Sequence, residues 1–153
     1  MTAPVFYLDY NASAPLLPEA AAAMTATFAL MGNPSSVHRA GRAARAVIED
    51  AREAVAALVN ATPAQVVFTS GATEANGLAL VTGPVTASAV EHPSVLAWAE
   101  AETISVDADG VIDLPALDNR LREFPPAVVA LMLANNETGV LQPVVDAAAL
   151  AHG

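Results

Sequence analysis

The segment Phe68-Thr-Ser-Gly-Ala-Thr-Glu-Ala-Asn-Gly77 has the residue types and spacing of a turn that binds an anion. Gly71 can adopt a positive φ and lets an anion approach the backbone. The free amides of Ala72 and Thr73, at the start of a predicted helix, carry partial positive charge that favours a phosphate. The Thr73 hydroxyl adds a further donor. The alternative is an ordinary strand-to-helix turn with a serine cap.

Two nucleotide-binding motifs are excluded by the sequence. The Walker pattern requires Gly-Lys-Ser or Gly-Lys-Thr, and the six basic residues of this chain are all arginine. The dinucleotide pattern Gly-x-Gly-x-x-Gly is also absent. The anion-binding turn therefore belongs to neither class.

His92 follows the strand predicted at Thr86–Val90 and precedes Pro93, at a predicted helix start. The N-terminus of a helix disfavours an imidazolium and so favours a neutral ring. A neutral imidazole could lie flat on an aromatic cofactor or transfer a proton. The alternative is a capping or core histidine. His38 and His152 carry weaker signals.

The polar loop Asn135-Asn-Glu137 follows the apolar segment Ala127–Leu133, which predicts a strand. Ligands of open parallel sheets gather at the carboxyl ends of strands. An asparagine in this loop could donate a hydrogen bond to a phenolate oxygen of a cofactor. The alternative is a turn that uses asparagine because asparagine tolerates unusual backbone angles.

Thr73, His92 and Asn136 all lie just past the ends of predicted strands. Strand ends of one parallel sheet share an edge, so a phosphate site, a stacking ring and an amide donor could converge there. The sequence therefore predicts one site rather than three separate features.

These residues require an alternating arrangement of strands and helices. Strands are predicted at Val66–Thr69, Thr86–Val90, Thr103–Val106 and Ala127–Leu133. Helices are predicted from Pro18 to about Met31, from a cap at Ser35 or Ser36 to Val59-Asn60, over Ala72–Leu80, from Glu91 through Trp98, over Leu114–Arg122, and from Pro143 onward. This alternation favours an α/β domain with a mostly parallel sheet and flanking helices.

Composition limits the partners and the location of the protein. A net charge of -10 makes the chain a poor electrostatic partner for nucleic acid or an anionic membrane. The absence of cysteine excludes disulfides and thiolate metal sites, fits a reducing cytoplasm, and leaves no predicted metal ligands. No apolar run reaches the roughly 18 residues of a membrane span, and the first residues do not form a secretory signal. We expect a cytoplasmic protein.

Five ordered motifs resemble the N-terminal part of the cysteine desulfurases, enzymes of the class V aminotransferase group that use pyridoxal 5'-phosphate (PLP). The motifs are Tyr7-Leu-Asp-Tyr-Asn-Ala-Ser-Ala-Pro15, Gly32-Asn-Pro-Ser-Ser-Val-His38, Phe68-Thr-Ser-Gly-Ala-Thr-Glu-Ala-Asn76, Val90-Glu-His-Pro-Ser-Val-Leu96 and Asn135-Asn-Glu-Thr-Gly-Val-Leu-Gln142. The resemblance covers essentially the whole chain. It leaves open the choice among desulfurase, selenocysteine lyase and other class V members.

The resemblance implies a role for each candidate residue. Gly71, Ala72 and Thr73 would bind the PLP phosphate. His92 would stack on the pyridine ring and, as the catalytic residue, assist proton transfer. Asn136 would reach the side of the ring that carries the 3-hydroxyl. The implied reaction removes sulfur from cysteine, leaving alanine and an enzyme persulfide, and its implied use is iron–sulfur cluster assembly.

The resemblance also implies an incomplete fold of the aspartate aminotransferase-like, PLP-transferase type. Residues 1–60 would form a helical N-terminal arm, and residues 61–153 part of the large PLP-binding domain, without its C-terminal half or the small domain. In the family, the first strand is separated from the next three by strands that come later in sequence. A sheet made from this chain alone would therefore have a gap or unpaired edges.

The departures from the family concern residues of its active site. The Schiff-base lysine, the aspartate beside the pyridine nitrogen, the substrate-binding arginine and the acceptor cysteine are not among these 153 residues. We therefore expect a segment that is inactive alone and that works as a homodimer or with a missing C-terminal part. The alternatives are a non-catalytic dimerisation or regulatory domain derived from the family, and a small-anion-binding α/β domain.

Overall fold

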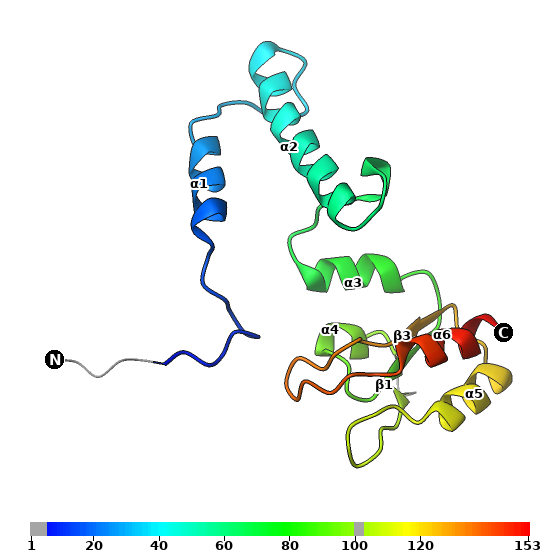
Figure 1. Cartoon of the computed structure of the whole chain (residues 1–153). Helices are drawn as coiled ribbons and strands as arrows, with labels where there is room; N and C mark the ends of the chain where they lie inside the picture. Colours follow the sequence, from blue (N-terminus) through cyan, green and yellow to red (C-terminus); the bar gives the residue numbers. More distant parts are fainter. Residues whose placement is uncertain (1–5, 100–102) are drawn as a thin grey trace. The chain divides into compact units, whose positions relative to one another are not determined.

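The computed structural model describes residues 6–99 and 103–153 (Figure 1). The chain divides into two compact units, Met1–Phe68 and Thr69–Gly153. The first unit contains α1 (Pro18–Thr27), α2 (Arg39–Leu58) and a short 3-10 helix, η1 (Pro63–Gln65). The second contains α3 (Ala72–Leu80), β1 (Val85–Ser88), α4 (Pro93–Leu96), β2 (Thr103–Ile104), α5 (Leu114–Glu123), β3 (Val128–Ala130) and α6 (Val144–His152).

Helix α1 begins at Pro18 as predicted, because proline suits a first helical turn. It ends at Thr27, short of the expected Met31. The Thr25 and Thr27 hydroxyls donate to the carbonyls of Ala21 and Met24, both over 2.8 Å. Such bonds to the preceding turn are typical of threonine and slightly destabilise a helix.

The cap of α2 differs from the prediction. His38 is the N-cap, and its Nδ1 accepts a hydrogen bond from the backbone N–H of Gly41 over 3.2 Å. Ser36 instead donates its backbone N–H to the carbonyl of Asn33, in the turn before the helix. The prediction of a cap at Ser35 or Ser36 is therefore wrong, because the serines are used by the preceding turn.

The strand predicted at Val66–Thr69 does not form. The side chain of Arg52 occupies this segment: its Nη1 donates to the carbonyl of Val66 over 2.5 Å, and its guanidinium carbon lies 5.0 Å from the centroid of the Phe68 ring. Val67 is 70% exposed and Phe68 48% exposed. A strand needs a hydrogen-bonded neighbour, and in the described part of the chain no other strand pairs with this segment.

The sheet of the second unit is parallel, as the alternating pattern predicts. Its strand order is β2-β1-β3, with β1 in the centre. Ala87 pairs with Thr103 on one side and with Ala130 on the other. All four residues of β1 are buried, because it has neighbours on both edges and helices on both faces. The other three predicted strands are thus confirmed, in shorter form.

Side chains alternate between the two faces of this sheet and form two cores. On one face Val128 and Ala130 of β3 pack with Leu80, Val85 and Val95, which come from α3, β1 and α4. On the other face Val129 and Leu131 pack against the cluster Ile104, Ile112, Leu117 and Ala147. Figure 1 shows α5 and α6, which carry the last two of these, lying side by side. Helices therefore cover both faces of the sheet.

Residues 6–99 and 103–153 contain neither a membrane-spanning helix nor a cluster of metal ligands. None of the helices there is both long enough and apolar enough to cross a bilayer. No group of three or more histidine, aspartate or glutamate side chains in those ranges is placed to hold a metal ion.

Candidate functional site

The start of α3 presents free backbone amides. Gly71 is its N-cap, and the first hydrogen bond of the helix runs from the N–H of Ala75 to the carbonyl of Gly71 over 3.1 Å. The amides of Ala72 and Thr73 precede this bond and have no acceptor within the helix. The Thr73 side chain is exposed and makes no hydrogen bond with the described residues. These donors can hold an anionic group.

Gly71 contributes open space rather than an unusual backbone conformation. Its φ is 165° and its ψ 179°, an extended conformation that any residue can adopt, so this turn does not use the left-handed freedom of glycine. A Cβ added at Gly71 would meet no atom within 4 Å. An approaching anion would therefore find this side of the helix start unobstructed.

Glu74 adds a negative charge to the first turn of α3 and uses its carboxylate to bind Ser70. Its Oε2 accepts hydrogen bonds from both the backbone N–H and the hydroxyl of Ser70, each over 2.6 Å. The hydroxyl bond, followed by the backbone bond, lowers the pKa of Glu74. Ser70 thus binds Glu74 instead of capping the helix, and the amides of Ala72 and Thr73 remain available.

His92 is the N-cap of α4, which confirms the capping interpretation of this histidine. The cap uses only one of its two ring nitrogens, Nδ1. Nδ1 accepts from the backbone N–H of Ser94 over 3.1 Å and lies 2.8 Å from the Ser94 hydroxyl oxygen. The residue is exposed, and Nε2 has no hydrogen-bond partner in the described ranges. The cap therefore leaves the ring faces and Nε2 available for chemistry.

Asn76 connects α3 to this histidine. Its amide nitrogen donates to the Ser94 hydroxyl oxygen over 2.8 Å, and both side chains are half-buried. Asn76 lies three residues after Thr73, so the two share one face of α3. The face of α3 that carries Thr73 and Asn76 is therefore linked to the ring of His92 through two hydrogen bonds. Neither Asn76 nor Ser94 was singled out from the sequence.

The adjacent asparagines of the loop after β3 have different surroundings. Asn135 is 9% exposed; its Oδ1 accepts from the N–H groups of Glu137 and Thr138, and its Nδ2 donates to the carbonyl of Val90 over 3.0 Å. Asn136 is exposed, and its Nδ2 donates to Oε1 of Glu137 over 2.9 Å. Asn135 therefore holds the loop in shape, and Asn136 is the one presented to solvent.

Glu91 forms a second link between the loops that follow β1 and β3. Its side chain is buried, and Oε1 accepts the backbone N–H of Met132 over 2.6 Å. Burial raises the pKa of Glu91, and the Met132 hydrogen bond opposes that rise. Together with the Asn135–Val90 bond, this contact fixes the loop of Asn136 to the loop of His92.

The structure thus joins the segments that carry the predicted site residues, although no hydrogen bond joins Thr73, His92 and Asn136 directly to one another in the ranges described. The donor set fits PLP. Free amides and a hydroxyl suit its phosphate, an exposed imidazole suits its ring, and an exposed amide suits its phenolic oxygen.

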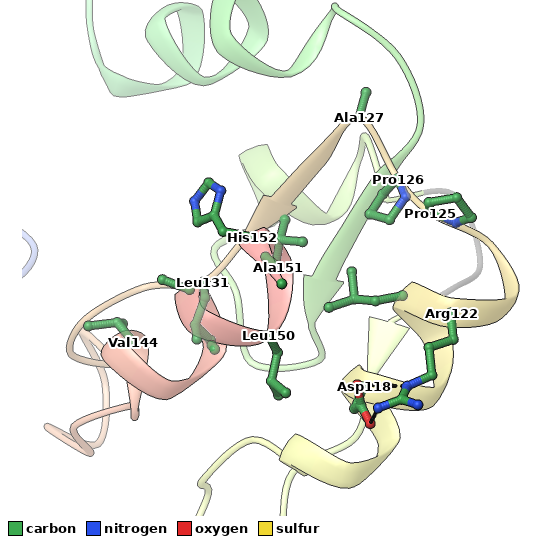
Figure 2. Close-up of a pocket in the computed structure, with 15 residues that line it drawn as sticks. Asp118, Arg122, Pro125, Pro126, Ala127, Leu131, Val144, Leu150, Ala151 and His152 are labelled. Carbon is green, nitrogen blue, oxygen red and sulfur yellow. Dashed lines mark hydrogen bonds and ion pairs between the residues drawn. The ribbon is translucent and has the colours of Figure 1, made fainter.

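A cavity of about 840 Å³ lies elsewhere in the second unit. Figure 2 shows Leu131, Val144, Leu150 and the paired side chains of Asp118 and Arg122 around it. It lies against α5, α6 and β3, and none of the predicted site residues lines it. Its size is therefore no guide to the chemistry predicted at the strand ends.

Comparisons with known proteins identify the family. Residues 6–153 match the family "Aminotransferase class-V". The chain is 39% identical to a cysteine desulfurase of Frankia sp. (strain EuIK1), over 94% of this chain and 41% of that protein. It is 37% identical to cysteine desulfurase IscS 1 of Archaeoglobus fulgidus, over 96% of this chain and 43% of that protein.

The fold is matched by a solved structure. An X-ray structure of a NifS-like protein from Rickettsia africae superimposes with a TM-score of 0.85 and 31% identity, covering 95% of this chain and 44% of that one. The chain thus spans about two fifths of the length of these relatives. Members of the matched family are PLP-dependent. The fold of this chain is part of the PLP-transferase large domain. The chain belongs to the class V aminotransferase family, among relatives that are cysteine desulfurases.

Proposed function

We propose that this chain forms the phosphate-binding and ring-stacking part of a PLP-dependent cysteine desulfurase site. The relatives named cysteine desulfurase support this assignment. When bound, PLP supplies an electron sink for bond cleavage in an amino-acid substrate. The overall reaction converts cysteine to alanine and leaves the sulfur as a persulfide on an acceptor cysteine.

Each candidate residue has a separate task in this proposal. The amides of Ala72 and Thr73, with the Thr73 hydroxyl, hold the phosphate, and the open side of Gly71 admits it. The His92 ring stacks against the cofactor and holds or releases a proton at Nε2. The amide of Asn136 donates to the phenolic oxygen, after exchanging its bond to Glu137.

The hydrogen-bonded connection from α3 to His92 is the single observation that carries the proposal. The Asn76–Ser94 and Ser94–His92 contacts are both 2.8 Å. They place the imidazole next to the helix that presents the free amides of Ala72 and Thr73. An isolated anion-binding turn would need no such connection to a histidine.

Two groups that the reaction requires are absent from this sequence. The 153 residues include neither lysine nor cysteine. Covalent attachment of the cofactor and acceptance of the sulfur are therefore assigned to residues outside these 153. A homodimer of this chain would not supply them. The cytoplasmic location and the homodimer both remain predictions.

Complementation tests this proposal. The chain would be mixed with, or fused to, the C-terminal part of a homologous cysteine desulfurase that carries the lysine and cysteine. Alanine formed from cysteine, and the sulfide that an added thiol reductant releases from the persulfide, would then be measured. We expect no product from either part alone, product from the assembled pair, and none when the lysine is replaced by alanine. An assembled or fused complex that binds no PLP would contradict the proposal.

A further inference from the structure

We infer that Asn76 and Ser94 are positioning residues that hold His92 as the neutral tautomer with its proton on Nε2. This inference deepens the proposed function, and the catalytic use of the tautomer rests on that function. The tautomer itself is a property of this chain alone, and it can be measured without cofactor or substrate.

The backbone of α4 fixes the role of Nδ1. The N–H of Ser94 points at Nδ1 over 3.1 Å, and a backbone N–H can only donate. Nδ1 must therefore offer its lone pair, and the proton of a neutral ring must be on Nε2. A protonated Nδ1 would direct its own N–H against that of Ser94.

The side chains of Ser94 and Asn76 favour the same tautomer. The Asn76 amide donates to Oγ of Ser94 over 2.8 Å, which uses a lone pair of the hydroxyl. The hydroxyl hydrogen is then free to point at Nδ1 of His92, also 2.8 Å away. Asn76 therefore donates to Ser94, and Ser94 in turn donates to His92. The reverse direction would require Nδ1 to donate to Ser94.

This arrangement also fixes the orientation of the ring. Turning the imidazole over would remove Nδ1 from both the N–H and the hydroxyl of Ser94. The exposed Nε2–H is therefore the edge that His92 presents to a ligand. Because Asn76 and Thr73 are neighbours on α3, the helix that holds the phosphate also sets the donor edge of the imidazole.

Nitrogen-15 NMR of the complete 153-residue chain tests the inference. Long-range proton–nitrogen correlations distinguish a protonated ring nitrogen from an unprotonated one, and His92→Gln identifies the signals among the three histidines. The spectrum would be recorded near pH 8.5, about two units above the ordinary imidazole pKa of ~6.5. We expect Nδ1 to be unprotonated and Nε2 protonated, with a preference of about tenfold or more.

Two variants separate positioning from folding. Asn76→Asp keeps the size of the side chain but makes it an acceptor for the Ser94 hydroxyl, so the tautomer preference should fall several-fold. Ser94→Ala should lower it similarly while keeping the backbone donor. Asn119→Asp, which adds the same charge at an exposed position of α5, should leave the His92 spectrum unchanged.

The outcomes are distinguishable from those of the complementation experiment. A His92 spectrum with Nδ1 protonated, or with evenly averaged tautomers in the unmodified chain, would overturn the inference. An unchanged preference in both Asn76→Asp and Ser94→Ala would also overturn it, leaving the backbone cap as the only determinant. A fixed tautomer in a chain whose assembled complex binds no PLP would support the inference and reject the proposed function.

Discussion

The backbone N–H of Met132 donates to Oε1 of Glu91 over 2.6 Å, joining two loops whose residues lie 41 positions apart in sequence. One loop carries His92 and the other Asn136. The carboxylate that makes this connection is buried, and burial outweighs the hydrogen bond, so the pKa of Glu91 lies above its ordinary value of 4.5. Burying the ionised carboxylate of Glu91 in this contact therefore lowers the free energy of unfolding.

Glu91→Gln should raise the free energy of unfolding relative to the unmodified protein. This gain should be larger at pH 7 than at pH 4. A carboxyl whose pKa is raised by folding takes up a proton on folding between its unfolded and folded pKa values. The free energy of unfolding therefore falls as pH rises through that window. Glutamine keeps an acceptor for Met132 and does not titrate. Urea unfolding of both proteins at the two pH values measures the difference, and a pH-independent difference would contradict the prediction.

Asn135→Ala should lower the free energy of unfolding by about 1–3 kcal/mol, because it removes a side chain that is 9% exposed and whose part-buried hydrogen bonds contribute roughly 1 kcal/mol each. The donors affected are the N–H groups of Glu137 and Thr138. Asn136→Ala is the matched control, and it should change stability by no more than about 0.5 kcal/mol, since its side chain is exposed. Equal losses in the two variants, measured by urea unfolding, would show that the loop does not depend on Asn135.

Both hydrogen-bonding groups of the Gln142 side chain should contribute to the free energy of unfolding. Its Oε1 accepts from the N–H of Ile112 over 2.9 Å, and its Nε2 donates to the carbonyl of Gly110 over 2.7 Å. Gln142→Ala should cost about 2–4 kcal/mol, because the buried N–H and carbonyl lose their partners. The side chain is 4% exposed, so solvent does not replace it readily.

Gln142→Glu gives the opposite pH dependence to Glu91→Gln. An ionised glutamate can accept from Ile112 but sets a negative charge against the carbonyl of Gly110. A protonated glutamate can both accept and donate. The variant should therefore be less stable than Gln142→Ala at neutral pH and should regain stability, relative to that variant, as pH falls. Thermal unfolding at pH 4 and pH 7 measures both, and parallel behaviour of the two variants would refute the paired hydrogen-bond account.

The sequence predicted elements that are specified locally. Pro18 and Pro93 each lie at a helix start, as their positions in the sequence indicate. Proline fixes φ and lacks an N–H that a first turn would leave unpaired, so a few neighbouring residues determine the start. The central strand was also recognised, although it was predicted at Thr86–Val90 and lies at Val85–Ser88.

Features that depend on distant partners were not predicted. Val66–Thr69 has the composition of a strand, yet composition cannot provide the neighbouring strand that would complete its hydrogen bonds. The Asn76–Ser94 contact joins residues 18 positions apart, on two helices whose packing was unknown. Asn135 and Asn136 are identical in type, and only the fold decides which one is buried. The sequence thus indicated candidate residues but not the contacts that connect their segments.

Thr73→Val should weaken PLP binding by the assembled complex by about 1 kcal/mol or more, roughly fivefold, because the phosphate loses one hydroxyl donor. Valine keeps the shape of threonine and the backbone amide. Pyridoxal, which lacks the phosphate, should bind the variant and the parent complex equally. Thr25→Val is the control in the other compact unit, where the hydroxyl donates to the carbonyl of Ala21. Titration followed by cofactor absorbance measures each affinity, and an unchanged affinity of Thr73→Val for PLP would remove Thr73 from the phosphate site.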